Sequence, residues 1–270
     1  MHLISLEEQQ ELLLALTAEK LSVEFAAGGS GANSMIGIAQ LGGRTAFSGK
    51  IGRDEHGKIY REKLEDLGVS ACLSEGEGST GSSLVLVSDD GCRTMNTYLG
   101  MSQELQAPDI DPEVIEASKY LYLTGYLWDT DSQKKAVRTA LDEAKRVETK
   151  VALSLSDPFC VTRHKEDFKS LLQGYVSMVF SNQEEAFTML DTNVTQEAVD
   201  IMSKWTETVV LTLGANGAII SHLGQTYYID PLPIRVEDTT GAGDAFAAGF
   251  LFGMTHEFSP LQSGRIGAAL

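Results

Sequence analysis

The sequence has little of what marks secreted, membrane-spanning or nucleic-acid-binding proteins. Its 270 residues include three cysteines, none in a Cys-x-x-Cys pair, so neither a disulfide framework nor a cysteine-based metal site is expected. No apolar run reaches the length of a membrane-spanning helix, and the first residues lack the pattern of a signal peptide. Basic residues are scarce, and the formal net charge of −17 disfavours nucleic acid and anionic membranes as partners. We therefore expect a cytoplasmic protein with reduced thiols.

Motifs of several large enzyme classes are also missing. The chain contains no Gly-x-x-x-x-Gly-Lys-Ser/Thr, no Gly-x-Ser-x-Gly and no His-Glu-x-x-His segment. A P-loop nucleotidase, a serine hydrolase of the nucleophile-elbow type and a zinc protease are therefore not expected. Gly241-x-Gly243 lacks the third glycine of a dinucleotide-binding fingerprint, because Phe246 stands there, so a Rossmann dehydrogenase fits poorly.

The residues that are present predict an α/β protein. A hydrophobic fraction of 43% and a charged fraction of 22% are typical of a globular chain with a sizeable core. Short apolar runs alternate with amphipathic ones, the pattern of a doubly wound sheet. Buried strands are predicted at 120–124, 151–156, 176–181 and 209–213, and a late antiparallel ribbon at 217–221, 226–229 and 234–236. Helices are predicted at 6–16, 32–41, 54–67, 132–147, 165–172, 183–190 and 196–205.

The most informative segment is 238–244, Asp-Thr-Thr-Gly-Ala-Gly-Asp. It leads into an apolar helical run, which places Gly241, Ala242 and Gly243 at a helix N-terminus, where unpaired amides and the helix dipole attract an anion. Asp244 adds a carboxylate in the first turn. An anion site beside a base is what phosphoryl transfer to a hydroxyl requires. By itself, this pattern is also typical of an ordinary turn before a helix.

A second glycine-rich turn lies near the start of the chain, Gly28-Gly29-Ser30-Gly31-Ala32-Asn33. Gly28 and Gly29 would let a ligand lie against bare backbone, and Asn33 offers a donor and an acceptor to a substrate hydroxyl. Alone, this segment is also typical of a simple strand–turn–helix connection.

Together, and in this order, the two segments resemble the N-terminal and C-terminal signatures of the ribokinase (PfkB) family of carbohydrate and nucleoside kinases. The resemblance implies one ribokinase-like α/β domain over 1–270, a three-layer sandwich with a mostly parallel central sheet. It also implies a small β-sheet lid from segments within 22–26, 44–49, 69–73 and 82–99. Asp89-Asp90-Gly91 is a hairpin turn signal inside the last of these segments.

The family resemblance assigns roles to individual residues and implies ATP and Mg²⁺ as cofactors. Asp244 would be the general base, and Gly241, Ala242 and Gly243 would offer amides to the transferred phosphoryl group. Gly28, Gly29 and Asn33 would bind the acceptor substrate.

Three further elements match the family's nucleotide half. Asn182 and Glu185 match an Asn-x-x-Glu element that helps to hold magnesium and its waters, although an Asn helix cap followed by acids gives the same pattern. The remaining matches are a nucleotide-binding loop with Thr212, Gly214 and Gly217, and a monovalent cation site, for K⁺, with Asp238 and Thr240.

The favoured substrate is adenosine, phosphorylated on a primary hydroxyl. Stretches 91–100, 123–128 and 153–160 resemble the bacterial adenosine-kinase-like branch, but sugar kinases share several of them, so a ribose- or fructose-type sugar kinase is the alternative. The aromatic residues able either to stack on a purine or to pack in the lid and core are Tyr98, Tyr126, Trp128 and Phe159.

Both ends of the chain differ from the family pattern. Relatives carry an earlier strand that grips the substrate hydroxyls and later helices beside the nucleotide base, and neither is visible here. We therefore expect a chain truncated at both ends, for which a non-catalytic ligand-binding fragment is the alternative function. A small-molecule substrate is expected as partner, and the protein is expected to be a monomer or a homodimer formed through the lid.

Overall fold

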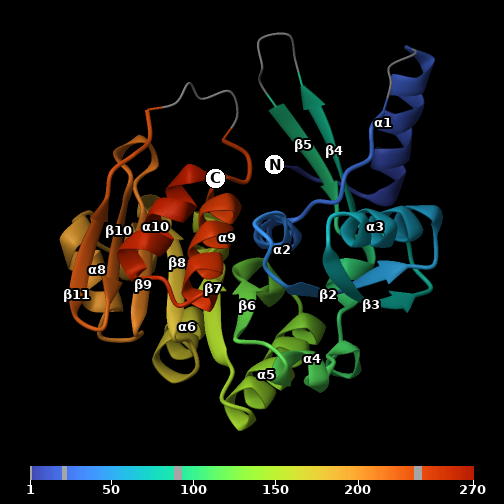
Figure 1. Ribbon diagram of the computed structural model, residues 1–270. Coiled ribbons are helices and arrows are strands. Elements are labelled where there is room, and N and C mark those ends of the chain that lie inside the picture. Colours follow the sequence, from blue (N-terminus) through green and yellow to red (C-terminus); the bar gives the residue numbers. More distant parts are fainter. Residues whose placement is uncertain (1, 20–22, 88–92, 234–238) are drawn as a thin grey trace.

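A six-stranded sheet forms the centre of the molecule (Figure 1). The computed structural model describes residues 2–19, 23–87, 93–233 and 239–270. The strand order is β11-β10-β9-β8-β7-β6. Strands β6 to β9 are parallel to one another, and β10 pairs antiparallel with both β9 and β11. The strands are β6 (Tyr120–Thr124), β7 (Lys150–Ser154), β8 (Met178–Asn182), β9 (Thr208–Thr212), β10 (Ala218–His222) and β11 (Gln225–Ile229).

Helices cover both faces of this sheet (Figure 1). One face carries α4 (Pro112–Glu116), α5 (Asp131–Arg146), α6 (Pro158–Gly174), α7 (Gln183–Leu190) and α8 (Thr195–Met202). The other carries α2 (Ser30–Gln40), α9 (Ala242–Thr255) and α10 (Pro260–Ala269). Successive strand residues point to opposite faces, so Leu153 and Val179 pack in the first layer while Ala152 and Phe180 pack in the second. This arrangement confirms the predicted three-layer α/β fold with a mostly parallel sheet.

The carboxyl ends of the parallel strands meet at one edge of the sheet. In the register of β8 and β9, Asn182 lies opposite Thr212, and β6 and β7 end together at Thr124 and Ser154. In open α/β sheets this edge is where ligands bind.

Two small sheets stand apart from the central one (Figure 1). Strands β2 (Thr45–Gly52) and β3 (Val69–Gly76) pair in parallel, beside α3 (Glu55–Asp66). Strand β5 (Arg93–Tyr98) pairs with β4 (Ser82–Val87) and with a two-residue β1 (His2–Leu3), beside α1 (Leu6–Ala18). The chain thus has a short strand before its first helix, where none was predicted.

The predicted lid sheet differs from this arrangement in two respects. Three of its four segments form strands, but these strands belong to two sheets, β2 with β3 and β5 with β4 and β1. The fourth segment is wrong as a strand: residues 23–26 have no strand structure, and residue 22 lies outside the described residues. Val23 and Phe25 are exposed, and the Phe25 ring contacts His56 of α3, with 5.5 Å between the ring centroids.

One helix begins earlier than predicted, and one predicted strand lies outside the described residues. Helix α6 begins at Pro158, earlier than predicted, because Asp157 caps it by accepting from the Cys160 amide at 2.7 Å; the predicted portion follows a kink at His164. The ribbon β10–β11 agrees with the sequence, while its third predicted strand at 234–236 lies outside the described residues. Within the described ranges, no helix has the length and apolar character needed to cross a membrane.

Candidate active site

The N-terminus of α9 is built as an anion site would require. Gly241 is the N-cap with φ of 78°, a conformation that favours glycine, and its carbonyl accepts from the Ala245 amide at 2.8 Å. The amides of Ala242, Gly243 and Asp244 therefore have no partner within the helix. The Ala242 amide instead donates to the Thr239 carbonyl at 3.1 Å. The Gly243 and Asp244 amides are then the two best placed to meet an anion.

Open space lies beside Gly243. A Cβ added there would meet no other atom within 4 Å, so the backbone at this point is accessible to a ligand. Gly241, in contrast, lies near Asn33 and Asp244, 3.7 and 3.8 Å from the position of an added Cβ. The amide roles predicted for residues 241–243 thus rest mainly on Gly243.

The Asp244 carboxylate is held from the neighbouring helix α2. The Ser30 hydroxyl donates to Oδ1 over 2.5 Å, and the Asn33 side-chain amide donates to Oδ2 over 3.0 Å. Burial raises the pKa of Asp244 above its ordinary value, and these two hydrogen bonds partly oppose that rise. The structure therefore brings together the predicted base and one predicted substrate-binding residue.

Close packing of two helices creates this contact. A Cβ on Gly37 of α2 would lie 2.7 Å from the Cβ of Ala248 on α9, so the glycine allows the helices to approach. At the start of α2, Gly28 and Gly29 have no other atom within 4 Å of an added Cβ, and Gly29 has φ of 96°. These two predicted substrate-binding glycines thus line open space next to Asn33.

Asn182 and Glu185 form a capping box at the start of α7. The Asn182 side chain accepts from the Glu185 amide at 2.8 Å, while its own side-chain and main-chain amides donate to the two Glu185 oxygens at 2.6 and 3.0 Å. Glu185 is 5% exposed, and burial, with Asp157 and Glu184 nearby, raises its pKa to about 7. The helix-cap interpretation is thus correct for the fold, and a magnesium role remains a prediction.

The described residues near Asn182 and Glu185 were also compared with what a metal ion needs. No group of three or more His, Cys, Asp or Glu side chains placed to hold a metal was found in the described part of the chain. Mg²⁺ usually keeps several waters and binds one or two carboxylates together with substrate phosphates, so Asn182 and Glu185 fit such an ion.

The predicted nucleotide loop follows β9. Thr212 lies opposite Asn182 and donates from its hydroxyl to the Ser181 carbonyl at 3.5 Å. Gly214 has φ of 57° and open space around an added Cβ, whereas a Cβ on Gly217 would lie 2.0 Å from a main-chain oxygen of Ile229. Gly214 is thus open to a ligand, while Gly217 is needed for the approach of β11.

The predicted monovalent cation site is described only in part. Thr240 lies in the turn just before α9, and Asp238 lies outside the described residues.

No role was predicted for Ser30 or for Tyr122. The spacing of Ser30 and Asn33, three residues apart, puts both on one helix face and could have signalled that they act together. Tyr122 on β6 lies near Ser34, Ser154 and Asp244, and burial raises its pKa to about 12. It is therefore a neutral group beside Asp244.

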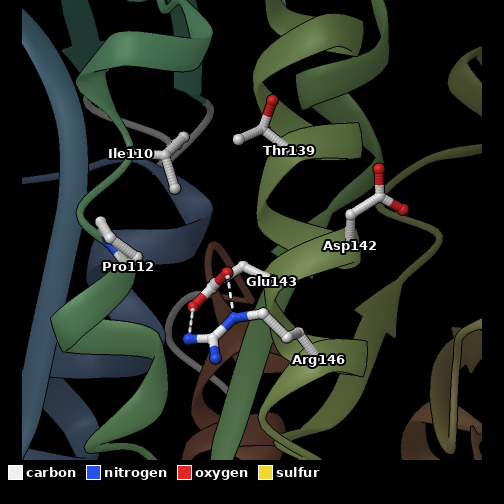
Figure 2. Close-up of a pocket in the computed structure, with 6 residues that line it drawn as sticks. All are labelled: Ile110, Pro112, Thr139, Asp142, Glu143 and Arg146. Atoms are coloured by element: carbon white, nitrogen blue, oxygen red, sulfur yellow. Dashed lines mark hydrogen bonds and ion pairs between the residues drawn. The ribbon is translucent and has the colours of Figure 1, made fainter.

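A surface hollow elsewhere has no part in this site. Figure 2 shows it between α4 and α5, where the Arg146 guanidinium donates to both Glu143 oxygens at 3.0 and 2.6 Å. These residues lie in the last turn of α5, which leads to the amino end of β7, the opposite edge of the sheet. Its lining residues are Ile110, Pro112, Thr139, Asp142, Glu143 and Arg146.

Comparisons with known proteins agree with this geometry. The profile of the pfkB family of carbohydrate kinases matches residues 1–270. A probable sugar kinase from Rhizobium etli has a similar structure, with a TM-score of 0.90 and 35% identity over 99% of this chain and 81% of its own. The adenosine kinase from Sinorhizobium meliloti has a TM-score of 0.89 and 34% identity over 99% and 82%. The 5-dehydro-2-deoxygluconokinase of Geobacillus kaustophilus is 29% identical over 90% of this chain and 76% of its own.

Proposed function

The chain belongs to the pfkB family of carbohydrate kinases, and we propose that it transfers a phosphoryl group from ATP to a primary hydroxyl of a nucleoside, with adenosine favoured. The observation that carries the proposal is the half-buried Asp244 carboxylate beside the open Gly243 amide at the start of α9. A base next to an anion site at the ligand-binding edge of the sheet suits transfer of phosphoryl to a hydroxyl.

In this mechanism Asp244 takes the proton of the acceptor hydroxyl as that oxygen attacks the γ-phosphorus, and the bond from this phosphorus to the bridging oxygen breaks, so that ADP leaves. A raised pKa strengthens the carboxylate as a proton acceptor. The Gly243 and Asp244 amides and the positive end of α9 offset the negative charge that develops on the phosphoryl oxygens. Magnesium, when bound with the nucleotide, neutralises phosphate charge, and Asn182 and Glu185 are the residues that would hold its waters.

The preference for a purine rests on which aromatic side chains are available. Trp128 is 3% exposed and its indole donates to Asp167 at 2.7 Å, so it belongs to the core. Phe159, in the first turn of α6, is 76% exposed, and Tyr126 is half-buried beside the same loop. An exposed phenyl ring next to the carboxyl end of β7 is a surface on which a purine could stack. The similarity to the S. meliloti adenosine kinase supports the same choice.

A sugar kinase is the second candidate, supported by the similarity to the R. etli protein. A free sugar would not need Phe159. The test measures ADP release with adenosine, ribose and fructose as acceptors, in the wild type and in Phe159→Ala. We expect turnover with adenosine and a KM for adenosine raised about tenfold in the variant, which corresponds to the loss of one stacking contact. Turnover with a sugar alone, unaffected by Phe159→Ala, would assign the protein to sugars.

Asp244→Asn tests the base. We expect kcat to fall by about 10²–10⁴, with ATP affinity by calorimetry close to that of the wild type. Retained turnover in this variant would remove Asp244 from the role. Binding of adenosine and ATP without any ADP release by the wild type would instead support a ligand-binding protein.

A further inference from the structure

Ser30 uses its hydroxyl in an unusual way for a residue at the start of a helix. A serine one residue earlier, at the N-cap, commonly accepts from the amides of its own helix. In α2 the N-cap is Gly29 and no side chain caps the helix. The Ser30 hydroxyl donates instead to Oδ1 of Asp244, 214 residues further along the chain, over 2.5 Å. A short bond to a carboxylate is of the strong, charge-assisted kind.

The two donors to Asp244 differ in what else they can do. Asn33 occupies Oδ2 at 3.0 Å and lies beside the open backbone of Gly28 and Gly29, where the acceptor substrate is proposed to bind. Each carboxylate oxygen can accept more than one hydrogen bond, so a substrate hydroxyl can reach Oδ2 beside Asn33, which also has an amide oxygen and a second N–H to offer the substrate. A serine hydroxyl has a single proton to donate and keeps it on Oδ1.

We propose that Ser30 is a positioning residue for Asp244: its hydroxyl fixes Oδ1 and thereby orients Oδ2 toward an acceptor hydroxyl bound beside Asn33. The inference rests on the proposed function, since it assumes that Asp244 is the base. Orientation of a base within hydrogen-bond distance of its proton contributes directly to the rate.

The proposal predicts a measurable change in the pKa of Asp244. The hydrogen bond from Ser30 lowers the pKa of Asp244, so its removal should raise that pKa further. The groups that face Asp244 from α2 are a hydroxyl and an amide, which do not titrate, and the group from β6 is the Tyr122 phenol, whose pKa of about 12 keeps it neutral. A shift in the acidic limb of the pH profile can therefore be assigned to Asp244.

The same helix supplies a matched control. The Ser34 hydroxyl, one turn after Ser30, lies within hydrogen-bond distance of the main-chain carbonyls of Asp244, at 3.2 Å, and of Ser30, at 3.3 Å, and its one proton is shared between them. Ser34→Ala removes a hydroxyl from the same helix face and leaves both bonds to the Asp244 carboxylate in place.

The experiment compares Ser30→Ala, Ser30→Thr and Ser34→Ala by the pH dependence of kcat/KM and by ¹³C NMR titration of the Asp244 carboxyl, assigned by its loss in Asp244→Asn. In Ser30→Ala we expect kcat to fall about tenfold, as for the loss of one charge-assisted hydrogen bond. Its acidic limb and the carboxyl titration should both move to higher pH. Ser30→Thr, which keeps the hydroxyl, should return both toward the wild type, and Ser34→Ala should leave both unchanged.

A titration of Asp244 that is the same in Ser30→Ala and the wild type would overturn the inference, as would an equal shift in Ser34→Ala. Full turnover in Asp244→Asn would contradict the proposed base instead, and it would do so whatever the NMR titration of the Ser30 variants gives. The two failures are thus distinguishable, because the carboxyl titration does not require an active enzyme.

Discussion

Glu185 should make the unliganded protein less stable as the pH rises from 5 to 8. Its carboxyl has an ordinary pKa of 4.5, and burial raises this to about 7 in the folded chain. Between these values the unfolded chain ionises while the folded chain keeps the proton, so ionisation favours unfolding. The stabilisation is fully present below pH 4.5 and is lost as the pH passes 7. At about 1.4 kcal/mol for each pH unit in that window, the loss between pH 5 and 8 is about 2.5 kcal/mol.

The assay is urea unfolding at pH 5, 6, 7 and 8, without magnesium or nucleotide, since either would favour the ionised carboxylate. Glu185→Gln removes the titration. The free energy of unfolding of this variant, relative to the wild type, should therefore rise by about 2.5 kcal/mol across the series. Glu184→Gln, an exposed neighbour in the same helical turn, should show no comparable change. A difference between Glu185→Gln and the wild type that stays constant with pH would refute the reasoning.

Five further substitutions have distinct expected outcomes. Gly243→Ala has room for its Cβ, so urea unfolding should show wild-type stability or better, while ADP release should fall at least tenfold because the methyl group enters the phosphoryl site. Gly217→Ala should lose at least about 2 kcal/mol in the same unfolding assay, and Gly214→Ala, strained only by its positive φ, about 1 kcal/mol. Trp128→Ala should lose about 3–5 kcal/mol, whereas Phe159→Ala should stay within about 0.5 kcal/mol of the wild type.

The central sheet could be predicted from the sequence because its strands are short apolar runs that repeat between helices. The strand at 120–124 was located to the residue, and the others within one or two residues. The lid was harder. Val23 and Phe25 alternate as a strand would, but a strand also needs a free partner edge, and local sequence does not reveal one. The two-residue β1 is too short to leave any pattern at all.

In the site, too, residues within a local motif could be predicted from the sequence, whereas contacts between distant segments could not. Asp244 and Asn33 were predicted because each lies within a local motif of recognisable spacing. Their contact, and that of Ser30 with the same carboxylate, depends on helices more than 200 residues apart in sequence, brought together where Gly37 meets Ala248. Such long-range packing is not encoded in a window of sequence. The requirement for Gly217 comes from a nearer contact, the approach of Ile229 at the end of β11, the next strand after β10.

The two buried carboxylates of the site differ in what holds them, and this difference matches their proposed roles. Glu185 is bound by Asn182 within the cap of α7, so these hydrogen bonds do not depend on the position of α7 relative to other helices. Asp244 takes both of its donors from α2, the element that also begins with the open Gly28 and Gly29. Any ligand that shifts the start of α2 therefore changes the hydrogen bonds, and with them the pKa, of Asp244, while Glu185 is left as it was. In the proposed mechanism, acceptor binding at the start of α2 would therefore adjust the base, Asp244, and leave Glu185, the residue proposed to hold magnesium's waters, unchanged.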